Sequence, residues 1–312
     1  WRMMKMARRI ALLCGGASGE REVSLLSAAA VEEALEKRYE VIKIDTGVEG
    51  WAHTLLDSSV EGVFICLHGG AGENGSIQGF CESVGLPYTG PGVLSSAIAM
   101  DKFVAKLLVE SFRIPTPGYI RVLRGEECNI EDIRTKLGGK LVVKPSTEGS
   151  ALGVSIVDNG DDLACAIDTA LELAPSVLVE QFISGRELTV AVLGGEKPRV
   201  LPPIEIIPAN EFYDYEAKYE QGMAQHICPA NLTEEELRQC EEMALGAHDA
   251  LGCYGVSRTD CILDERNRLW YLETNTIPGM TGTSLLPDAA KAVGITFDEL
   301  CWNIMEDAWS RC

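Results

Sequence analysis

Residues 255–284 read GVSRTDCILDERNRLWYLETNTIPGMTGTS, a stretch that predicts a β-hairpin followed by a polar loop. Residues 256–263 and 268–275 are rich in strand-forming residues, and the polar cluster DERN between them is typical of a turn. The dipeptide PG at 278–279 marks a second turn, and the hydroxyl-rich sequence after it is suited to holding an anion. An ordinary exposed hairpin with scattered charges is the alternative interpretation of this stretch alone.

Four polar side chains come together if the hairpin forms. Because side chains alternate faces along a strand, Arg258 shares a face with Asp260, and Glu273 shares one with Asn275. With the turn centred near residues 265–267, Asp260 falls almost opposite Glu273, and Arg258 falls almost opposite Asn275. Two carboxylates placed across from each other repel. A hard cation such as Mg²⁺ would remove this repulsion, because it binds carboxylate and amide oxygens and leaves positions open for phosphate.

The composition is that of a globular enzyme. The chain has 312 residues, of which 46% are hydrophobic and 24% are charged, so two or three subdomains are expected. The formal net charge of −20 argues against nucleic-acid binding, because nucleic acid attracts basic surfaces. An anionic substrate would need locally concentrated lysines and arginines against this acidic background.

The cysteines and apolar runs indicate a cytoplasmic protein that does not bind membranes. Eleven cysteines show no CxxC pair, and most lie in apolar runs, as Cys14, Cys66 and Cys261 do. Free buried thiols are therefore expected rather than disulfides. The apolar run at 10–14 is too short for a signal core or a transmembrane helix.

The N-terminal part of the chain predicts a parallel α/β unit. Its expected elements are strands at 10–14, 39–44 and 62–67 and a helix at 20–37. A dinucleotide-binding dehydrogenase is the alternative, but the spacing GxGxxG is absent. The glycine-rich loop at 68–79 follows a strand, which is where open α/β sheets bind ligands.

The middle of the chain predicts a phosphate-binding loop. A helix is expected at 95–112, and a strand at 140–144 leads into the loop STEGSALG at 146–153. The backbone N–H groups of such a glycine-rich loop can fold over phosphates. The Walker pattern GxxxxGK[ST] is absent, and a plain hairpin turn is the alternative. Further strands are expected at 154–157, 177–182 and 188–193.

Eight blocks of sequence stand in one order between about residues 10 and 287. They are GGASGEREVSL, HGGAGENGSIQG, YTGPGV with MDK, KPSTEGSALG, SGRELTVAVLGG, FYDYEAKY, GVSRTDCIL and LETNTIPGMTGTSLLP. In this order the blocks resemble those of the D-alanine–D-alanine ligases, which belong to the ATP-grasp superfamily. The resemblance implies a three-domain ATP-grasp fold of the α/β class, with ATP between two antiparallel sheets. Its parts would be an N-terminal parallel α/β domain (1–97), a central subdomain with the phosphate flap (98–186) and a C-terminal subdomain with the metal and substrate site (187–312).

The resemblance also implies a reaction and its partners. Two D-alanines would be joined through an acyl phosphate, with cleavage of ATP to ADP and phosphate, for peptidoglycan precursor synthesis. Two Mg²⁺ ions, replaceable by Mn²⁺, would assist, and the enzyme would be a homodimer. Lys102, Lys144 and Lys218 would contact ATP, where a lysine acts as a point charge on phosphate. Glu180 would bind the adenine amino group, and Glu187 the ribose hydroxyls.

The remaining site residues follow from the same resemblance. Asp260, Glu273 and Asn275 would hold the metal ions, in agreement with the hairpin. Arg258 and the backbone N–H of Gly279 would stabilise a tetrahedral oxyanion, which is often the largest electrostatic contribution to such catalysis.

Further residues would hold the two amino acids. Glu20 would pair with the ammonium group of the first D-alanine, and His68 would lie nearby. Ser284 and Leu285 would hold the second carboxylate through a hydroxyl and a backbone N–H. The polar segment 210–219 would close as a lid that excludes water.

The lid would be held closed by a hydrogen-bonded chain of Tyr219, Ser150 and Glu20.

Two departures from the family pattern are visible: Asn74 replaces a usual Asp, and Ala151 replaces a common second Ser. A ligase that uses D-lactate or D-serine as second substrate is the nearest alternative, although FYDYEAKY at 212–219 resembles the D-alanine type. A non-catalytic ATP-binding module is the alternative of another class, but it would have no need of an oxyanion group such as Arg258.

Overall fold

The computed structural model describes residues 7–150, 152–158, 162–208 and 224–311. Its helices are α1 (Arg21–Leu35), α2 (Trp51–Asp57), α3 (Ser76–Ser83), α4 (Val93–Met100), α5 (Lys102–Ser111), α6 (Ile130–Leu137), α7 (Leu163–Leu173), α9 (Glu234–Ala250), α10 (Leu285–Ala292) and α11 (Phe297–Ser310), with a 3₁₀ turn at Gly70–Gly72. Its strands are β1 (Arg9–Cys14), β2 (Glu40–Asp45), β3 (Gly62–Ile65), β4 (Tyr119–Leu123), β5 (Leu141–Pro145), β6 (Ser155–Val157), β7 (Ser176–Gln181), β8 (Gly185–Gly194), β9 (Arg199–Val200), β10 (Ile204–Pro208), β11 (Ala224–Ile227), β12 (Gly255–Asp264) and β13 (Leu269–Asn275). They form one parallel and two antiparallel sheets, which confirms the predicted fold class.

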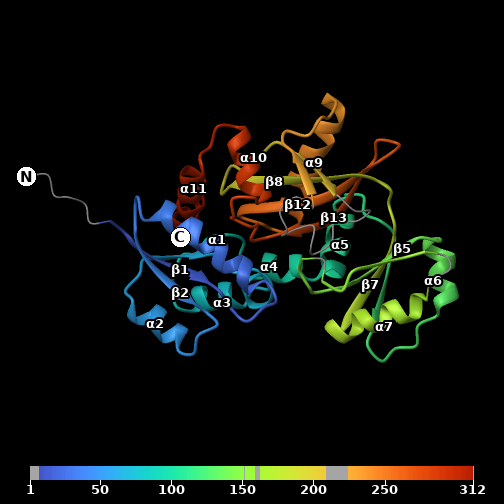
Figure 1. The fold of residues 1–312 in the computed structure, drawn as a ribbon, viewed down its shortest axis with the longest axis horizontal. Coiled ribbons are helices and arrows are strands. Elements are labelled where there is room, and N and C mark those ends of the chain that lie inside the picture. The colour runs from blue at the N-terminus through green and yellow to red at the C-terminus, as the bar shows by residue number, and fades with distance from the viewer. Residues whose placement is uncertain (1–6, 151, 159–161, 209–223, 312) are drawn as a thin grey trace, which may run out of the picture.

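The N-terminal sheet has the strand order β2-β1-β3, and both strand pairs are parallel (Figure 1). Residues 10–14 of the central strand β1 are all buried, as is usual for a sheet covered on both faces. Because β1 and β3 run in the same direction, the loops that follow them lie at the same edge of the sheet. This arrangement brings Glu20, at the start of α1, near His68, which follows β3.

The last helices of the chain complete the core of this first layer. One apolar cluster contains Ile10 of β1 together with Leu300 and Ile304 of α11. Trp302 Nε1 donates a hydrogen bond to the carbonyl oxygen of Ala34 at 2.9 Å. Figure 1 shows α11 beside α1 and the N-terminal strands. The beginning and the end of the described chain therefore form one packed body.

The middle sheet is antiparallel, with the strand order β4-β7-β5-β6. Helices α6 and α7 pack against it through a cluster that includes Ile133, Val143, Ile167 and Val179. β5 and β6 pair as a hairpin, so the predicted phosphate loop at 146–153 lies at the end of this hairpin. In Figure 1 this sheet and its two helices form the lobe farthest from the N-terminus.

The third sheet is also antiparallel, with the order β11-β10-β8-β12-β13 and with β9 paired to β8. One face packs against α5 and α9 through a cluster that includes Val109, Leu188 and Ala244. Val256 and Ile206 of the same sheet belong instead to the cluster shared with the N-terminal layer. Strand β8 begins at Gly185, just before the predicted boundary between residues 186 and 187.

The single helix predicted for residues 95–112 is wrong, because the structure has two helices there. α4 ends at Met100 and α5 begins at Lys102. Asp101 between them is extended, with φ −84° and ψ 97°, and its carboxylate accepts hydrogen bonds from the backbone N–H groups of Phe103 and Val104. An aspartate in this position caps a helix, and the new start places Lys102 in the first turn of α5.

The sequence predicts free cysteines rather than disulfides, and it predicts no transmembrane helix. The ten cysteines within the described ranges are all free, and six of them are buried. No helix in the described part of the chain has both the length and the apolar character needed to cross a bilayer.

Candidate active site

Strands β12 and β13 hold the predicted metal ligands and the predicted oxyanion group in register. Asp260 lies opposite Glu273, and Arg258 lies opposite Asn275, which confirms the predicted pairing. The register shifts just after Asp260, so Leu272 is the extra residue of a β-bulge on β13. Bulges near active sites re-aim side chains. Without this one, Leu272 would stand opposite Asp260.

The carboxylate of Asp260 accepts hydrogen bonds from three side chains. Arg258 donates from Nε at 3.0 Å and from Nη2 at 2.8 Å. Thr189 Oγ1 donates at 2.5 Å, and Asn275 Nδ2 donates at 3.1 Å. Asp260 is only 7% exposed, so these donors replace the water that it loses. The two-point contact with Arg258 also fixes the plane of the guanidinium group.

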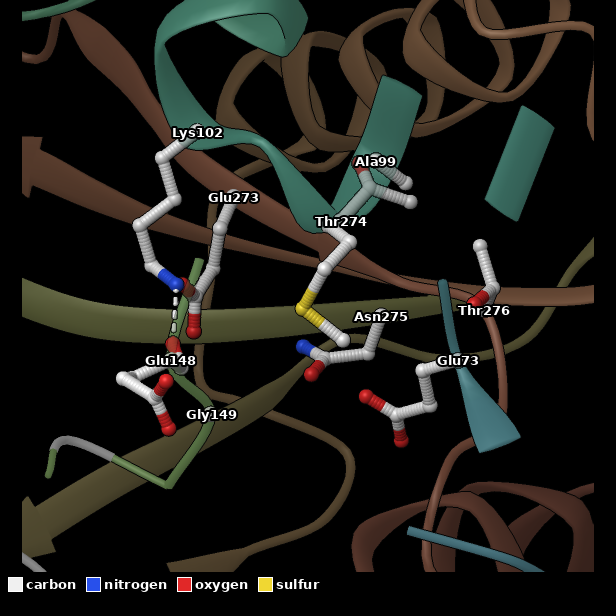
Figure 2. Close-up of a pocket in the computed structure, with 10 residues that line it drawn as sticks. Glu73, Ala99, Lys102, Glu148, Gly149, Glu273, Thr274, Asn275 and Thr276 are labelled. Atoms are coloured by element: carbon white, nitrogen blue, oxygen red, sulfur yellow. Dashed lines mark hydrogen bonds and ion pairs between the residues drawn. The ribbon is translucent and has the colours of Figure 1, made fainter. Parts of the chain in front are cut away.

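Glu273 is balanced by a different cation, as Figure 2 shows. Lys102 Nζ lies 3.3 Å from Glu273 Oε2 and donates to the carbonyl oxygen of Glu148 at 2.6 Å. The backbone N–H of Lys102 also donates to the carbonyl of Ser146 at 2.9 Å. Lys102 therefore joins α5, the phosphate loop and the hairpin. The expected repulsion between the two carboxylates is reduced by Arg258, which the alternation already placed beside Asp260, and by Lys102, which lies outside the hairpin and could not be found from its alternation.

A cavity of about 410 Å³ opens beside the hairpin. Its lining includes nine residues predicted from the sequence: Glu20, His68, Ser150, Arg258, Asp260, Asn275, Gly279, Ser284 and Leu285. A smaller pocket adjoins it and shares Glu73, Gly149 and Asn275, while Lys102 and Glu273 line its other side. In Figure 2 the carboxylate of Glu73 points toward the side chain of Asn275. Residues predicted for the substrates and Lys102, predicted for the phosphates, thus line two adjoining spaces.

The phosphate loop is seated on the start of α1. Ser150 Oγ donates a hydrogen bond to Glu20 Oε1, and Ser150 has a positive φ of 50°. A Cβ atom on Gly149 would lie 2.7 Å from Glu20 Oε2, so a larger residue there would push the Glu20 carboxylate aside. The Ser150–Glu20 contact of the predicted chain is therefore present. Tyr219 of that chain, Lys218 and the predicted lid at 210–219 lie outside the described residues.

The loop after β13 offers donors to an anion. A Cβ atom on Gly279 would lie 2.8 Å from Ser284 Oγ, so a larger residue there would displace the Ser284 hydroxyl. Ser284 Oγ accepts a hydrogen bond from the backbone N–H of Thr281 at 2.9 Å. Leu285 begins α10. Because free N–H groups and the helix dipole favour negative charge at a helix start, this side of the cavity suits a carboxylate.

Comparison with known proteins accounts for this arrangement. Residues 108–306 match the family described as "D-ala D-ala ligase C-terminus", and residues 43–91 match "D-ala D-ala ligase N-terminus". The chain belongs to the D-alanine–D-alanine ligase family. A D-alanine–D-alanine ligase of Pelotomaculum thermopropionicum is 43% identical over 314 residues, with 98% of each chain covered. One of Desulforudis audaxviator is 46% identical over 308 residues, covering 98% of this chain and all of the relative.

Solved structures of the ligase family share the fold. The D-alanine–D-alanine ligase of Bacillus anthracis superposes with a TM-score of 0.88 at 34% identity and covers 98% of both chains. A Bacillus anthracis ligase complexed with ATP gives 0.86 at 32% identity, again over 98% of both. VanG D-Ala:D-Ser ligase of Enterococcus faecalis gives 0.85 at 32% identity, over 97% of this chain and all of that one. These likenesses confirm the ATP-grasp architecture.

In this ligase-family chain, two residues predicted to bind ATP belong to a buried ionic cluster. Glu180 Oε1 lies 2.9 Å from Lys144 Nζ and 3.2 Å from Lys106 Nζ. Although burial alone would raise it, the two lysines hold the pKa of Glu180 below its ordinary value. Burial lowers the pKa of Lys106 to about 8, and Glu180 opposes that shift. Lys106 was not predicted as a site residue; its position one helical turn after Lys102 was the available signal.

Three predicted ATP contacts stand apart from the cavities. Lys144, Glu180 and Glu187 are not among the lining residues of either one. Glu187 lies on β8 opposite Ile206 of β10 and Ile262 of β12. Lys102 alone of the four described ATP-contact predictions lines one of these two spaces.

Glu73 is a further residue of this candidate site that was not predicted from the sequence. It lines both cavities, and its Oε1 lies 3.7 Å from His68 Nδ1. Burial raises the pKa of Glu73, His68 opposes the shift, and the charge of Glu20 adds to it. The available signal was a carboxylate in the loop HGGAGENG, five residues after His68.

Proposed function

We propose that this enzyme joins two D-alanines into D-alanyl-D-alanine at the expense of ATP, for peptidoglycan precursor synthesis. The observation that carries the proposal is the shared cavity, which Glu20, Arg258, Gly279 and Ser284 all line. Relatives with this ligase activity in their names, 43% and 46% identical over nearly the whole chain, support it.

The first step activates one D-alanine. Its carboxylate oxygen attacks the γ-phosphorus of ATP, the bond from that phosphorus to the bridging oxygen breaks, and ADP leaves with the electron pair. Glu20 holds the ammonium group of this D-alanine, and Lys102 offsets charge on the transferring phosphoryl group. The Ser150–Glu20 hydrogen bond closes the phosphate loop over the acyl phosphate and limits access of water.

The second step forms the peptide bond. The amine of the second D-alanine attacks the acyl carbon after losing a proton, and phosphate leaves from the tetrahedral intermediate. Arg258 and the backbone N–H of Gly279 stabilise the oxyanion, while Ser284 and the start of α10 hold the second carboxylate. The contact with Asp260 orients the Arg258 guanidinium before the charge develops.

The donor set of the hairpin fits magnesium or manganese. Asp260, Glu273 and Asn275 supply carboxylate and amide oxygens from facing strand positions, which are the ligands that hard cations prefer. Such ions would neutralise phosphate oxygens during phosphoryl transfer. Lys102 pairs with Glu273 in this structure. In the proposed reaction it would contact the phosphates of ATP as well.

The remaining ATP contacts extend the proposal into the antiparallel sheets. Lys144 would reach the phosphates, Glu180 the adenine amino group and Glu187 the ribose, and Lys218 lies outside the described residues. The Bacillus anthracis structure complexed with ATP, which shares the fold at 32% identity, supports nucleotide binding. A cytoplasmic homodimer with the three predicted domains completes the proposal.

A D-serine or D-lactate acceptor is the closest alternative. The structural likeness to a D-Ala:D-Ser ligase is close, with a TM-score of 0.85. The Bacillus anthracis D-alanine ligase structures are no more than 34% identical, so the solved structures alone do not separate the two acceptors. The relatives at 43% and 46% identity are both D-alanine–D-alanine ligases, which favours D-alanine as acceptor. The pairing of Arg258 with Asp260 at the cavity favours an enzyme over a passive ATP-binding module.

An ADP-release assay tests the proposed function. Purified enzyme with Mg²⁺ and ATP is given D-alanine, L-alanine or no amino acid, and the products are separated by mass. ADP and D-alanyl-D-alanine in equal amounts, with D-alanine alone, are expected. Equal ADP release in the three samples would contradict the proposal, and a mixed product with D-serine or D-lactate in competition would shift it to the alternative acceptor.

A further inference from the structure

A chain of polar contacts links the loop after β3 to the loop after β13. Glu73 Oε1 lies 3.7 Å from His68 Nδ1, and His68 Nε2 lies 3.2 Å from Ser27 Oγ on α1. The same Ser27 oxygen accepts a hydrogen bond from the backbone N–H of Met280 at 3.3 Å. The chain therefore ends at the peptide that directly follows Gly279.

One arrangement of protons is consistent with both hydrogen bonds of Ser27 and with the contact between His68 and Glu73. The Met280 N–H donates to Ser27 Oγ, and the single hydroxyl proton of Ser27 is then directed to His68 Nε2. When Nε2 accepts from Ser27, the ring N–H of His68 is at Nδ1, 3.7 Å from the carboxylate of Glu73. Because Ser27 is 0% exposed and His68 is 5% exposed, water cannot readily replace these partners.

The order serine, histidine, carboxylate is also that of a hydrolase triad, but the geometry excludes that role. A nucleophilic serine must expose its Oγ to a substrate. Ser27 is fully buried, is absent from the lining of the substrate cavity and accepts a backbone N–H. These polar contacts therefore serve to fix the conformation of the loop that contains Gly279.

We infer that Ser27, His68 and Glu73 are positioning residues that hold the Gly279–Met280 peptide and thereby aim the oxyanion donor at Gly279. A glycine has the least restricted backbone, so the peptide after it needs an external anchor. Ser27 supplies that anchor from the N-terminal domain. The inference rests on the proposed function, in which the Gly279 N–H stabilises the tetrahedral intermediate of the second step.

The test separates the two chemical steps. ATP labelled with ¹⁸O at the β,γ-bridge scrambles its label when acyl phosphate formation reverses, so the scrambling rate reports the first step. Dipeptide formation reports the second step. In Ser27→Ala we expect the ratio of scrambling to dipeptide formation to rise roughly tenfold or more, because small misplacements of a catalytic group cost up to about 100-fold in rate. The acceptor KM should change less than kcat.

Ser24→Ala is the matched control. Ser24 lies one turn earlier on α1, is also 0% exposed and makes two hydrogen bonds, to the carbonyl of Cys66 at 2.6 Å and from the N–H of Gly15 at 2.8 Å. Ser24→Ala also loses a buried hydroxyl oxygen, but this oxygen does not contact Met280. Its ratio of scrambling to dipeptide formation should therefore equal that of the wild type. Ser27→Cys, which leaves no empty space and replaces the hydroxyl by a weaker hydrogen-bond acceptor, decides the test if Ser27→Ala does not fold.

The outcomes are distinct. A ratio that rises in the Ser27 variant and not in Ser24→Ala supports the inference. An unchanged ratio, with both steps slowed equally or not at all, overturns it and leaves a structural role for the chain. Wild-type enzyme that shows neither scrambling nor dipeptide formation would instead overturn the proposed function.

Discussion

The face of β12 that lines the cavity carries charged side chains, whereas the opposite face carries neutral polar ones. Arg258 and Asp260 line the cavity. On the other face Ser257 Oγ lies 2.7 Å from Nδ1 of His248 in α9, and Thr259 Oγ1 lies 3.2 Å from the hydroxyl of its cross-strand neighbour Thr274. The charged side chains therefore lie on the face where substrate and ions can pair with them. The core face carries hydroxyl and imidazole groups that form hydrogen bonds with one another.

The neutrality of the core face depends on His248. This side chain is 4% exposed, and burial lowers its pKa to about 4. At neutral pH it is therefore uncharged, while the cavity face of the same strand holds an ion pair. Residues on the cavity face are therefore expected to affect turnover, and residues on the core face to affect stability. Four variants test this distinction.

Glu273→Gln should have the largest effect on turnover. The amide keeps the shape of the side chain but removes the charge shared by Lys102 and the proposed metal site, so kcat should fall roughly 1000-fold. The melting temperature should change by less than about 3 °C, because Lys102 keeps its hydrogen bond to the carbonyl of Glu148 and the amide also ends the repulsion with Asp260. Phosphate release and thermal unfolding measure both quantities. Near-normal kcat would place the metal site elsewhere.

Arg258→Lys should lower kcat roughly 10- to 100-fold. A lysine keeps the positive charge but cannot make the two-point contact with Asp260 that orients the group. Arg186→Lys is the control, since Arg186 makes a similar contact with Glu205, at 2.8 and 2.7 Å, away from the cavity. An equal loss of activity in both variants would argue for a general effect of arginine replacement.

His248→Gln should remove part of the acid sensitivity of the fold. The folded pKa of about 4 lies below the ordinary value of 6.5, so the unfolded state binds more protons between these pH values. Wild-type stability should fall as pH drops from 6.5 toward 4, by up to roughly 3 kcal/mol from this group. Urea unfolding at several pH values should show a shallower slope for the variant. Parallel slopes would show that His248 does not contribute.

Thr259→Val should have the smallest effect. The change keeps the shape of the side chain and leaves the Thr274 hydroxyl without this partner, so the free energy of unfolding should fall by about 1 kcal/mol. Because Thr259 faces away from the cavity, kcat should stay within about twofold of wild type. Urea unfolding and the ADP-release assay provide the two numbers. A large loss of kcat with intact stability would break the distinction between the faces.

The hairpin could be predicted because its information is local. Alternation fixes which side chains share a face, and the turn at 264–267 sets the pairing to within one residue. The bulge at Leu272 shifts the register by one residue, and the alternation of the sequence does not show it. The parallel N-terminal sheet was likewise predictable from short apolar runs and glycine turns.

The ionic contacts could not be predicted because they join distant parts of the chain. Lys102 meets Glu273, and Lys106 meets Glu180, only after α5 has packed between the sheets. The capping role of Asp101 was hidden because helix formers surround it on both sides. Glu73 was missed because a loop carboxylate is ordinarily solvated, whereas here the side chain is only 14% exposed and lies 3.7 Å from His68.

The packing of α11 on the first layer has a consequence for how the protein is made. Strand β1 and α1 leave the ribosome early, yet Leu300, Ile304 and Trp302, which cover them, are synthesised nearly three hundred residues later. Contacts of such long sequence separation form slowly, because a long loop must close first. During translation the part of this apolar cluster that α11 covers therefore stays open until the end of the chain has been made. A nascent chain stalled before residue 297 should be a substrate for chaperones.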